Sequence, residues 1–121
     1  MIKHQFLTDE GILIISPVSS LHSRDFDTLS HIIDPYIAEH GALNGLIIYT
    51  QSFPGWQNFT SMLAHVKFVR DHHAKIQKVA AVADEGIVSV LPAIASHFVK
   101  AEVKHFDHDE LDNAIEWVMQ D

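Results

Sequence analysis

The histidines are the side chains of this sequence whose spacing comes closest to a metal site. His65 and His72 fall in a segment with helical periodicity, two turns apart and about 10.5 Å along a helix axis. Helical zinc ligands are instead spaced three or four residues apart. His105 and His108 have that interval, but they span the end of a predicted strand and a turn. We therefore predict no metal and no cofactor, and interpret both groups as solvated or capping histidines unless they meet in the fold.

A group of apolar residues suggests a second kind of chemistry, the binding of a small molecule. Phe53, Pro54 and Trp56 follow the apolar run 45–50, and Phe59 comes three residues after Trp56. In α/β folds the carboxyl end of a central strand is where sites are usually built. These side chains could line a pocket for an apolar or lipid-like ligand. The simpler alternative is that Trp56 packs over the end of the sheet as part of the core.

Catalytic motifs are missing from the sequence. It has no nucleophilic serine elbow, no glycine-rich phosphate loop and no HExxH pattern. The absence of cysteine also removes thiolate nucleophiles and disulfides. Paired acids at Asp84 with Glu85, and at Asp107 with Asp109, follow predicted strands, where turns and helix caps account for them. We predict that the protein is not an enzyme.

The composition is that of a single globular domain, which we place at residues 1–121. Hydrophobic residues make up 47% and charged residues 20% of the chain, which is enough apolar material for one core. A net charge of −8 without a run of Lys and Arg disfavours nucleic acid as a partner. No apolar run approaches the ~18 residues of a membrane span, and no signal peptide is visible. We therefore predict a cytoplasmic protein that is not transmembrane.

Two charged segments have competing interpretations. A basic group surrounds a predicted helix end, where cations are favourable in their own right, and an anion site is the alternative. It consists of Lys67, Arg70, Lys75 and Lys78. Residues 105–121 contain six carboxylates and no Lys or Arg. We interpret these acids as a solvated helix face, with an acidic docking surface as the alternative.

Hydrophobic periodicity and turn residues divide the chain into five strands and four helices. The predicted strands are 3–8, 11–16, 45–50, 79–83 and 101–106, and the predicted helices are 24–40, 57–74, 88–98 and a last one capped by Asp107 or Asp109. Pro35 predicts either a kink in the first helix or a split, with a second piece starting there. Gly41 is the expected residue after its end. This order predicts an α/β fold with four helices covering a five-stranded mixed sheet, whose first hairpin is an antiparallel edge.

The helix predicted at 57–74 carries an apolar side chain on its polar face. Its buried stripe consists of Phe59, Met62, Leu63, Val66 and Val69. Phe68 projects from the opposite side, which it shares with His65 and His72. Because an apolar group on an otherwise polar face often marks a contact, we predict a protein interaction here, with a homodimer as one form of it.

Three stretches of the chain carry a resemblance to a known family. They are LIIYTQSFPGW with the following helix containing LAHVKF, then RDHHAKIQKVAAVAD, then AEVKHFDHDELDNAIEWV, and together they cover most of residues 43–119. In their order and spacing they resemble the SpoIIAA-like proteins, a small bacterial family related in fold to the STAS domains of anti-sigma-factor antagonists and to the lipid-binding CRAL-TRIO domain. The resemblance implies a STAS-like fold and a non-enzymatic regulatory module that acts through a protein partner. The CRAL-TRIO relation implies the alternative of an apolar ligand near Trp56.

The resemblance also bears on phosphorylation. In anti-sigma-factor antagonists an Asp-Ser pair begins the helix after the third strand, and a partner kinase phosphorylates the serine. The corresponding positions here hold Gln57 and Asn58. Thr60 and Ser61 are the nearby candidates, because a phosphate near a helix N-terminus is favoured electrostatically.

Overall fold

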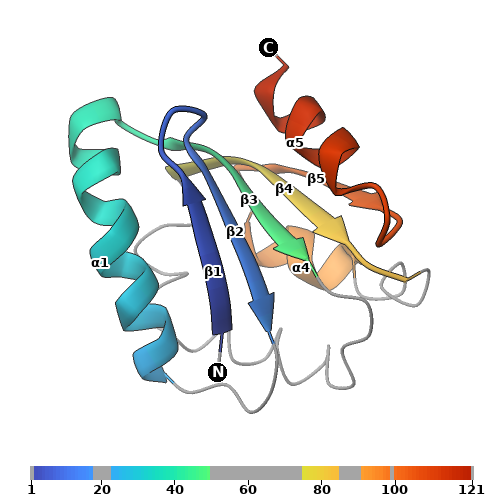
Figure 1. The fold of residues 1–121 in the computed structure, drawn as a ribbon, viewed down its shortest axis with the longest axis horizontal. Coiled ribbons are helices and arrows are strands. Elements are labelled where there is room, and N and C mark those ends of the chain that lie inside the picture. The colour runs from blue at the N-terminus through green and yellow to red at the C-terminus, as the bar shows by residue number, and fades with distance from the viewer. Residues whose placement is uncertain (1, 18–22, 50–74, 85–90, 99, 121) are drawn as a thin grey trace.

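The computed structural model describes residues 2–17, 23–49, 75–84, 91–98 and 100–120 (Figure 1). These residues form the strands β1 (Ile2–Leu7), β2 (Ile12–Pro17), β3 (Leu43–Tyr49), β4 (Ile76–Val82) and β5 (Glu102–Phe106), and the helices α1 (Ser23–His40), α4 (Leu91–His97) and α5 (Leu111–Met119). The predicted α/β class is confirmed. The helix predicted at 57–74 lies outside the described residues, so the described part of the chain contains three helices and does not support four.

The strands form one mixed sheet whose spatial order follows the chain order, from β1 to β5. β1 and β2 are antiparallel, and Gly11 in the turn between them has a φ of 67° and donates its N–H to Leu7 O at 2.8 Å. β2, β3, β4 and β5 run parallel to one another. The predicted five-stranded mixed sheet with an antiparallel edge hairpin is therefore confirmed.

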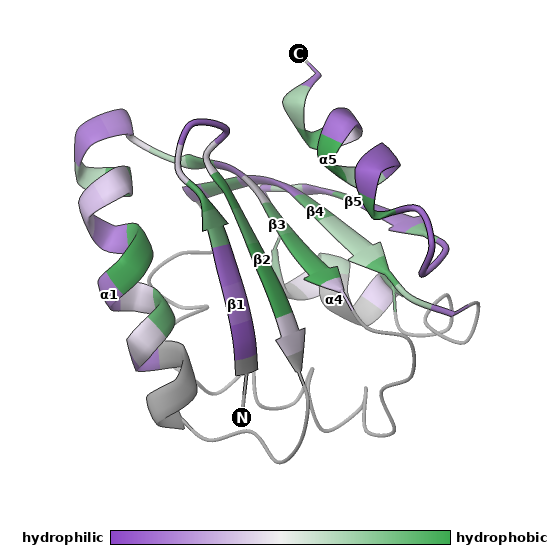
Figure 2. Cartoon of the chain, viewed as in Figure 1, coloured by the Kyte–Doolittle hydropathy of each residue, from purple (hydrophilic) through white to green (hydrophobic). Residues whose placement is uncertain are grey.

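The position of each strand in the sheet explains its composition. β3 buries residues 45–48 and β4 buries residues 79–82, whereas β1 and β5 at the edges keep exposed side chains. Figure 2 shows the same contrast, with β1 largely hydrophilic and β2 and β3 hydrophobic. The part of a strand that is covered on both faces must be apolar, and this is why residues 45–48 and 79–82 form continuous runs.

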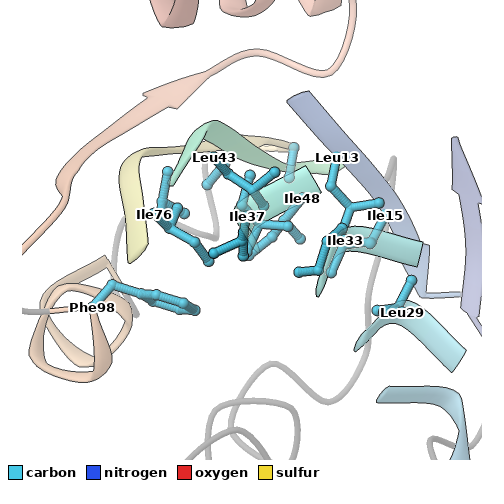
Figure 3. Packing of buried hydrophobic residues seen from close by; sticks show 13 residues of the cluster. Leu13, Ile15, Leu29, Ile33, Ile37, Leu43, Ile48, Ile76 and Phe98 are labelled. Carbon is cyan, nitrogen blue, oxygen red and sulfur yellow. The ribbon is translucent and has the colours of Figure 1, made fainter. Parts of the chain in front are cut away.

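Helices cover both faces of the sheet. When parallel strands are added in one direction, right-handed crossovers bring the connecting helices to the same face. The first core cluster accordingly contains Leu29 and Ile33 of α1 together with Phe98, which follows α4 (Figure 3). α5 comes after the last strand and packs on the opposite face, where Ala114 and Val118 join the second cluster.

Helix α1 continues from Ser23 to His40 although Pro35 lies inside it. Pro35 is exposed, while Ile33 and Ile37 are buried against the sheet. Burial of this apolar stripe outweighs the one N–H that proline lacks. The predicted split at Pro35 is wrong, and a kink stays a prediction.

Gly41, with a φ of 90°, donates its N–H to Ile37 O at 2.7 Å, which confirms it as the residue that ends the helix.

Candidate interaction surface

The residues predicted to line a pocket, make a contact or accept a phosphate all fall within 50–74, outside the described residues. They are Phe53, Pro54, Trp56 and Phe59 for the pocket, Phe68, His65 and His72 for the contact, and Thr60 and Ser61 for phosphorylation. Their roles stay predictions. Within the described ranges, two of the places where polar and aromatic side chains gather involve β4 and β5, and a third joins Phe6 of β1 to Tyr36 and His40 of α1.

The first place is the carboxyl end of β4 and β5, where the two C-terminal histidines bind different partners. His105 Nε2 lies 2.9 Å from Ala83 O, and because a carbonyl only accepts, this nitrogen carries the proton. His108 Nδ1 lies 3.3 Å from Asp84 Oδ1. Both contacts join the end of β5 to residues after β4. In the part of the chain that the structure describes, no three His, Asp or Glu side chains are placed to hold a metal ion.

The start of α5 differs from its prediction. The N-cap residue is Glu110, and it makes no side-chain cap hydrogen bond. Its carboxylate instead accepts the Asp107 N–H at 3.1 Å and an Asn113 Nδ2–H at 3.2 Å. The Glu110 N–H donates to Asp107 O at 2.9 Å, so Asp107 and Asp109 belong to the turn that precedes the helix. The predicted capping by Asp107 or Asp109 is therefore wrong.

The second place is a group of two lysines and two aromatic residues beside α5, which we call the Lys–Trp cluster (Lys78, Lys104, Phe106 and Trp117). The rings of Phe106 and Trp117 lie 5.8 Å apart, tilted by 53°. Lys104 Nζ lies 5.1 Å from the Phe106 ring centroid and 5.8 Å from that of Trp117. A cation over an aromatic face is held by the charge distribution of the ring, so Lys104 has a preferred position on this surface.

Lys78 stabilises the end of α5 within this cluster. Its ammonium donates to Trp117 O at 2.9 Å and to Gln120 O at 2.6 Å, and lies 5.2 Å from the Trp117 ring. A cation near the last carbonyls of a helix is favoured by the helix dipole. The sequence interpretation assigned Lys78 to the end of the helix predicted at 57–74. In the structure Lys78 lies on β4, and its ammonium group bonds the last carbonyls of α5.

Replacing Lys78 with methionine is expected to lower the free energy of unfolding by about 1–2 kcal/mol, because the α5 carbonyls lose a charged donor while most of the aliphatic packing stays. Lys104→Met is the matched control, since among the described residues Lys104 contacts only aromatic rings. Its expected loss is under about 1 kcal/mol. Urea unfolding measures both variants, and equal losses would contradict the capping role of Lys78.

One signal for this surface was present in the sequence and was missed. Glu102, Lys104 and Phe106 alternate with Val103 and His105, and a period of two places the first three on one face of the sheet. Lys78 lies next to Glu102 on the neighbouring strand. This position depends on the register between β4 and β5, and no local sequence pattern contains that register.

The surface of α5 is acidic. Asp112 and Glu116 on the helix, and Asp107 and Asp109 before it, are exposed. This exposure agrees with the predicted solvated helix face, and an acidic docking surface stays a prediction.

The comparisons with known proteins point to one family. A family model described as SpoIIAA-like matches residues 12–119. The match begins in β2 and ends in α5, and thus spans four of the five strands. Searches of the curated proteins and of the solved structures found no match. None of the described helices is both long and apolar enough to cross a membrane.

Proposed function

The chain belongs to the SpoIIAA-like family, and on that premise we propose that it is a STAS-type regulatory module that acts by binding another protein rather than by catalysing a reaction. The observation that carries this proposal is the family match itself, which runs from β2 to α5. The polar groups at the ends of β4 and β5 support it, because they are used in contacts that hold the strands together.

The sequence pattern suggests where the partner binds. Phe68 is predicted on the polar face of the helix at 57–74, beside His65 and His72. An aromatic anchor surrounded by polar residues is a common centre of a protein interface. We propose this face as the contact, and we propose no role for Thr60 or Ser61 in forming it.

The proposal is tested by identifying and then measuring the complex. The tagged chain is isolated at its native expression level, co-purifying proteins are identified, and binding of the purified partner is measured by titration calorimetry. Phe68→Asp is expected to weaken this binding by about tenfold or more, because an interface anchor is typically worth over 1 kcal/mol.

Met119→Asp is the matched control, since Met119 is an apolar residue that is 55% exposed on α5. Its expected effect on partner binding is within about twofold, as for a substitution outside the interface. Equal losses for Phe68→Asp and Met119→Asp, or a complex that neither variant weakens, would refute the proposed contact face. The absence of any specific partner would refute the proposed function.

A further inference from the structure

The outer edge of β5 has backbone groups directed away from the sheet. β5 is the last strand in the sheet order, next to β4 alone (Figure 1). Phe106 O accepts the Ala83 N–H at 3.0 Å, so Phe106 directs its backbone groups toward β4. Backbone groups alternate along a strand, so Val103 and His105 direct theirs outward. Within the described ranges, no backbone group is bonded to these outer N–H and C=O groups.

Two opposite charges stand beside this edge. Glu102 and Lys104 are exposed and lie on the same face of β5. Among the described residues, neither forms an ion pair or a hydrogen bond, and Lys104 Nζ is held over the rings of Phe106 and Trp117. The edge therefore presents an anion and a cation two positions apart, with Val103 between them.

We propose that two copies of this chain pair their β5 strands antiparallel, centred on Val103, to form one continuous sheet. In this register the two Val103 residues face each other and exchange both backbone hydrogen bonds, as their outward groups require. Glu102 of each copy then faces Lys104 of the other, and the two pairs lie on the same face. Opposite charges in directly facing positions stabilise a strand pair.

The charges select this register among those that the backbone allows. Two facing residues in an antiparallel pair must both direct their backbone N–H and C=O groups toward the other strand, or both direct them away from it. The twofold axis of the dimer must therefore lie between the two copies of a single residue, which is called here the axis at that residue. An axis at Glu102 places two carboxylates opposite each other, and an axis at Lys104 places two ammonium groups opposite each other. Like charges in facing positions are unfavourable. An axis at His105 leaves Lys104 facing Phe106. An axis at Ala101 would face Glu102 with Lys100, but the Ala101 N–H already donates to Phe98 O at 2.9 Å and is not free to bond a second strand. Only the axis at Val103 joins Glu102 to Lys104.

The other edge strand, β1, lacks charges that could pair between two copies of the chain. β1 contains a single charged residue, Lys3, beside exposed His4 and Gln5. Two copies of β1 therefore form no pair of opposite charges in any register. Of the two edge strands, β5 is the one whose charges can pair with those of an identical strand. A second copy of the chain is therefore the partner that we propose for this edge.

Charge reversal tests the proposal by sedimentation velocity of the purified protein over a range of concentrations. Glu102→Lys and Lys104→Glu each turn two attractive pairs into repulsive ones, and are each expected to raise the dissociation constant of the dimer by about tenfold or more. The double variant restores two opposite pairs, and its dissociation constant is expected to return to within about threefold of the original. Circular dichroism melting checks that all three variants are folded.

A monomer at the highest soluble concentration overturns the proposal. A dimer whose dissociation constant is unchanged by the charge reversals also overturns it. So does a dimer that is dissociated by Phe68→Asp but not by Glu102→Lys. These measurements use the isolated chain, so their outcome is independent of whether the proposed regulatory partner exists.

The register is tested by disulfide formation, which the absence of native cysteine makes simple to interpret. Facing Cα atoms in a hydrogen-bonded antiparallel pair lie about 5.5 Å apart, within the range of a disulfide. Val103→Cys is therefore expected to give a covalent dimer on mild oxidation. In the control Ala101→Cys, each cysteine faces His105 of the second copy and lies about 13 Å from the other cysteine along the strand direction, so no dimer is expected. Failure of Val103→Cys, or faster linkage through Lys104→Cys, refutes this register.

Discussion

Replacing Phe98 with alanine is expected to lower the free energy of unfolding by about 3–5 kcal/mol. Phe98 is fully buried, and it has the greatest volume of the fully buried side chains in the described residues. It follows α4 and points toward Ile76 in the first core cluster (Figure 3). Alanine removes the contacts of the ring and leaves a cavity that a packed core closes only in part.

The backbone around Phe98 separates the loss of packing from other effects. Phe98 O accepts the Ala101 N–H at 2.9 Å, and this bond leads into β5. Because alanine keeps it, the expected loss comes from the side chain alone. Urea unfolding followed by circular dichroism measures the change. Met119→Ala, at a site that is 55% exposed, is the control and should change stability by less than about 0.5 kcal/mol. A loss below 1 kcal/mol for Phe98→Ala would contradict the buried position.

Adding one methyl group at Gly45 is expected to destabilise the fold by about 1–3 kcal/mol, because β3 and α5 touch at this glycine. A Cβ on Gly45 would overlap Val118 Cγ1 and lie 3.0 Å from Val118 Cγ2. Val118 is buried and its branched side chain has little freedom to move away. Gly45→Ala must therefore shift α5 relative to the sheet.

A second substitution can relieve this overlap. Combining Gly45→Ala with Val118→Ala should cost about 1 kcal/mol less than the sum of the two single losses, because each change makes room for the other. Gly41→Ala is the control: a Cβ at Gly41 meets nothing within 4 Å, but its φ of 90° strains any other residue. Val118→Ala should give it no relief. Additive losses for Gly45→Ala and Val118→Ala would disprove the close contact between β3 and α5.

The end of α1 and the start of α5 show how far local patterns lead. Gly41 was predicted correctly, because a left-handed residue after a helix is a local requirement that glycine meets best. The N-cap of α5 was predicted incorrectly, although Asp107 and Asp109 are good capping residues. Both lie before Glu110, in a turn closed by the bond from Glu110 N–H to Asp107 O. Several acids compete for one cap, and local preference alone does not rank them.

Pro35 and the candidate sites show where local patterns fail for other reasons. Proline is unfavourable inside a helix, but α1 continues past Pro35 because its buried apolar side chains pack against the sheet. This stabilisation comes from tertiary contacts and not from the helix itself. The predicted pocket around Trp56 and the contact at Phe68 lie outside the described residues and stay predictions. The Lys–Trp cluster was not predicted, because its members come from β4, β5 and α5.

The strands could be predicted from the sequence, because continuous apolar runs such as 45–48 and 79–82 are typical of strands covered on both faces. The order of strands and helices predicted the mixed sheet, and three stretches within residues 43–119 predicted the family. Sequence patterns did not reveal that Lys78 stabilises the end of α5, or that Glu102 and Lys104 lie together at an edge of the sheet. Strand register and edge position are set by packing between segments that are distant in the chain. A shift of one residue would leave the local sequence unchanged and turn every one of these side chains to the other face.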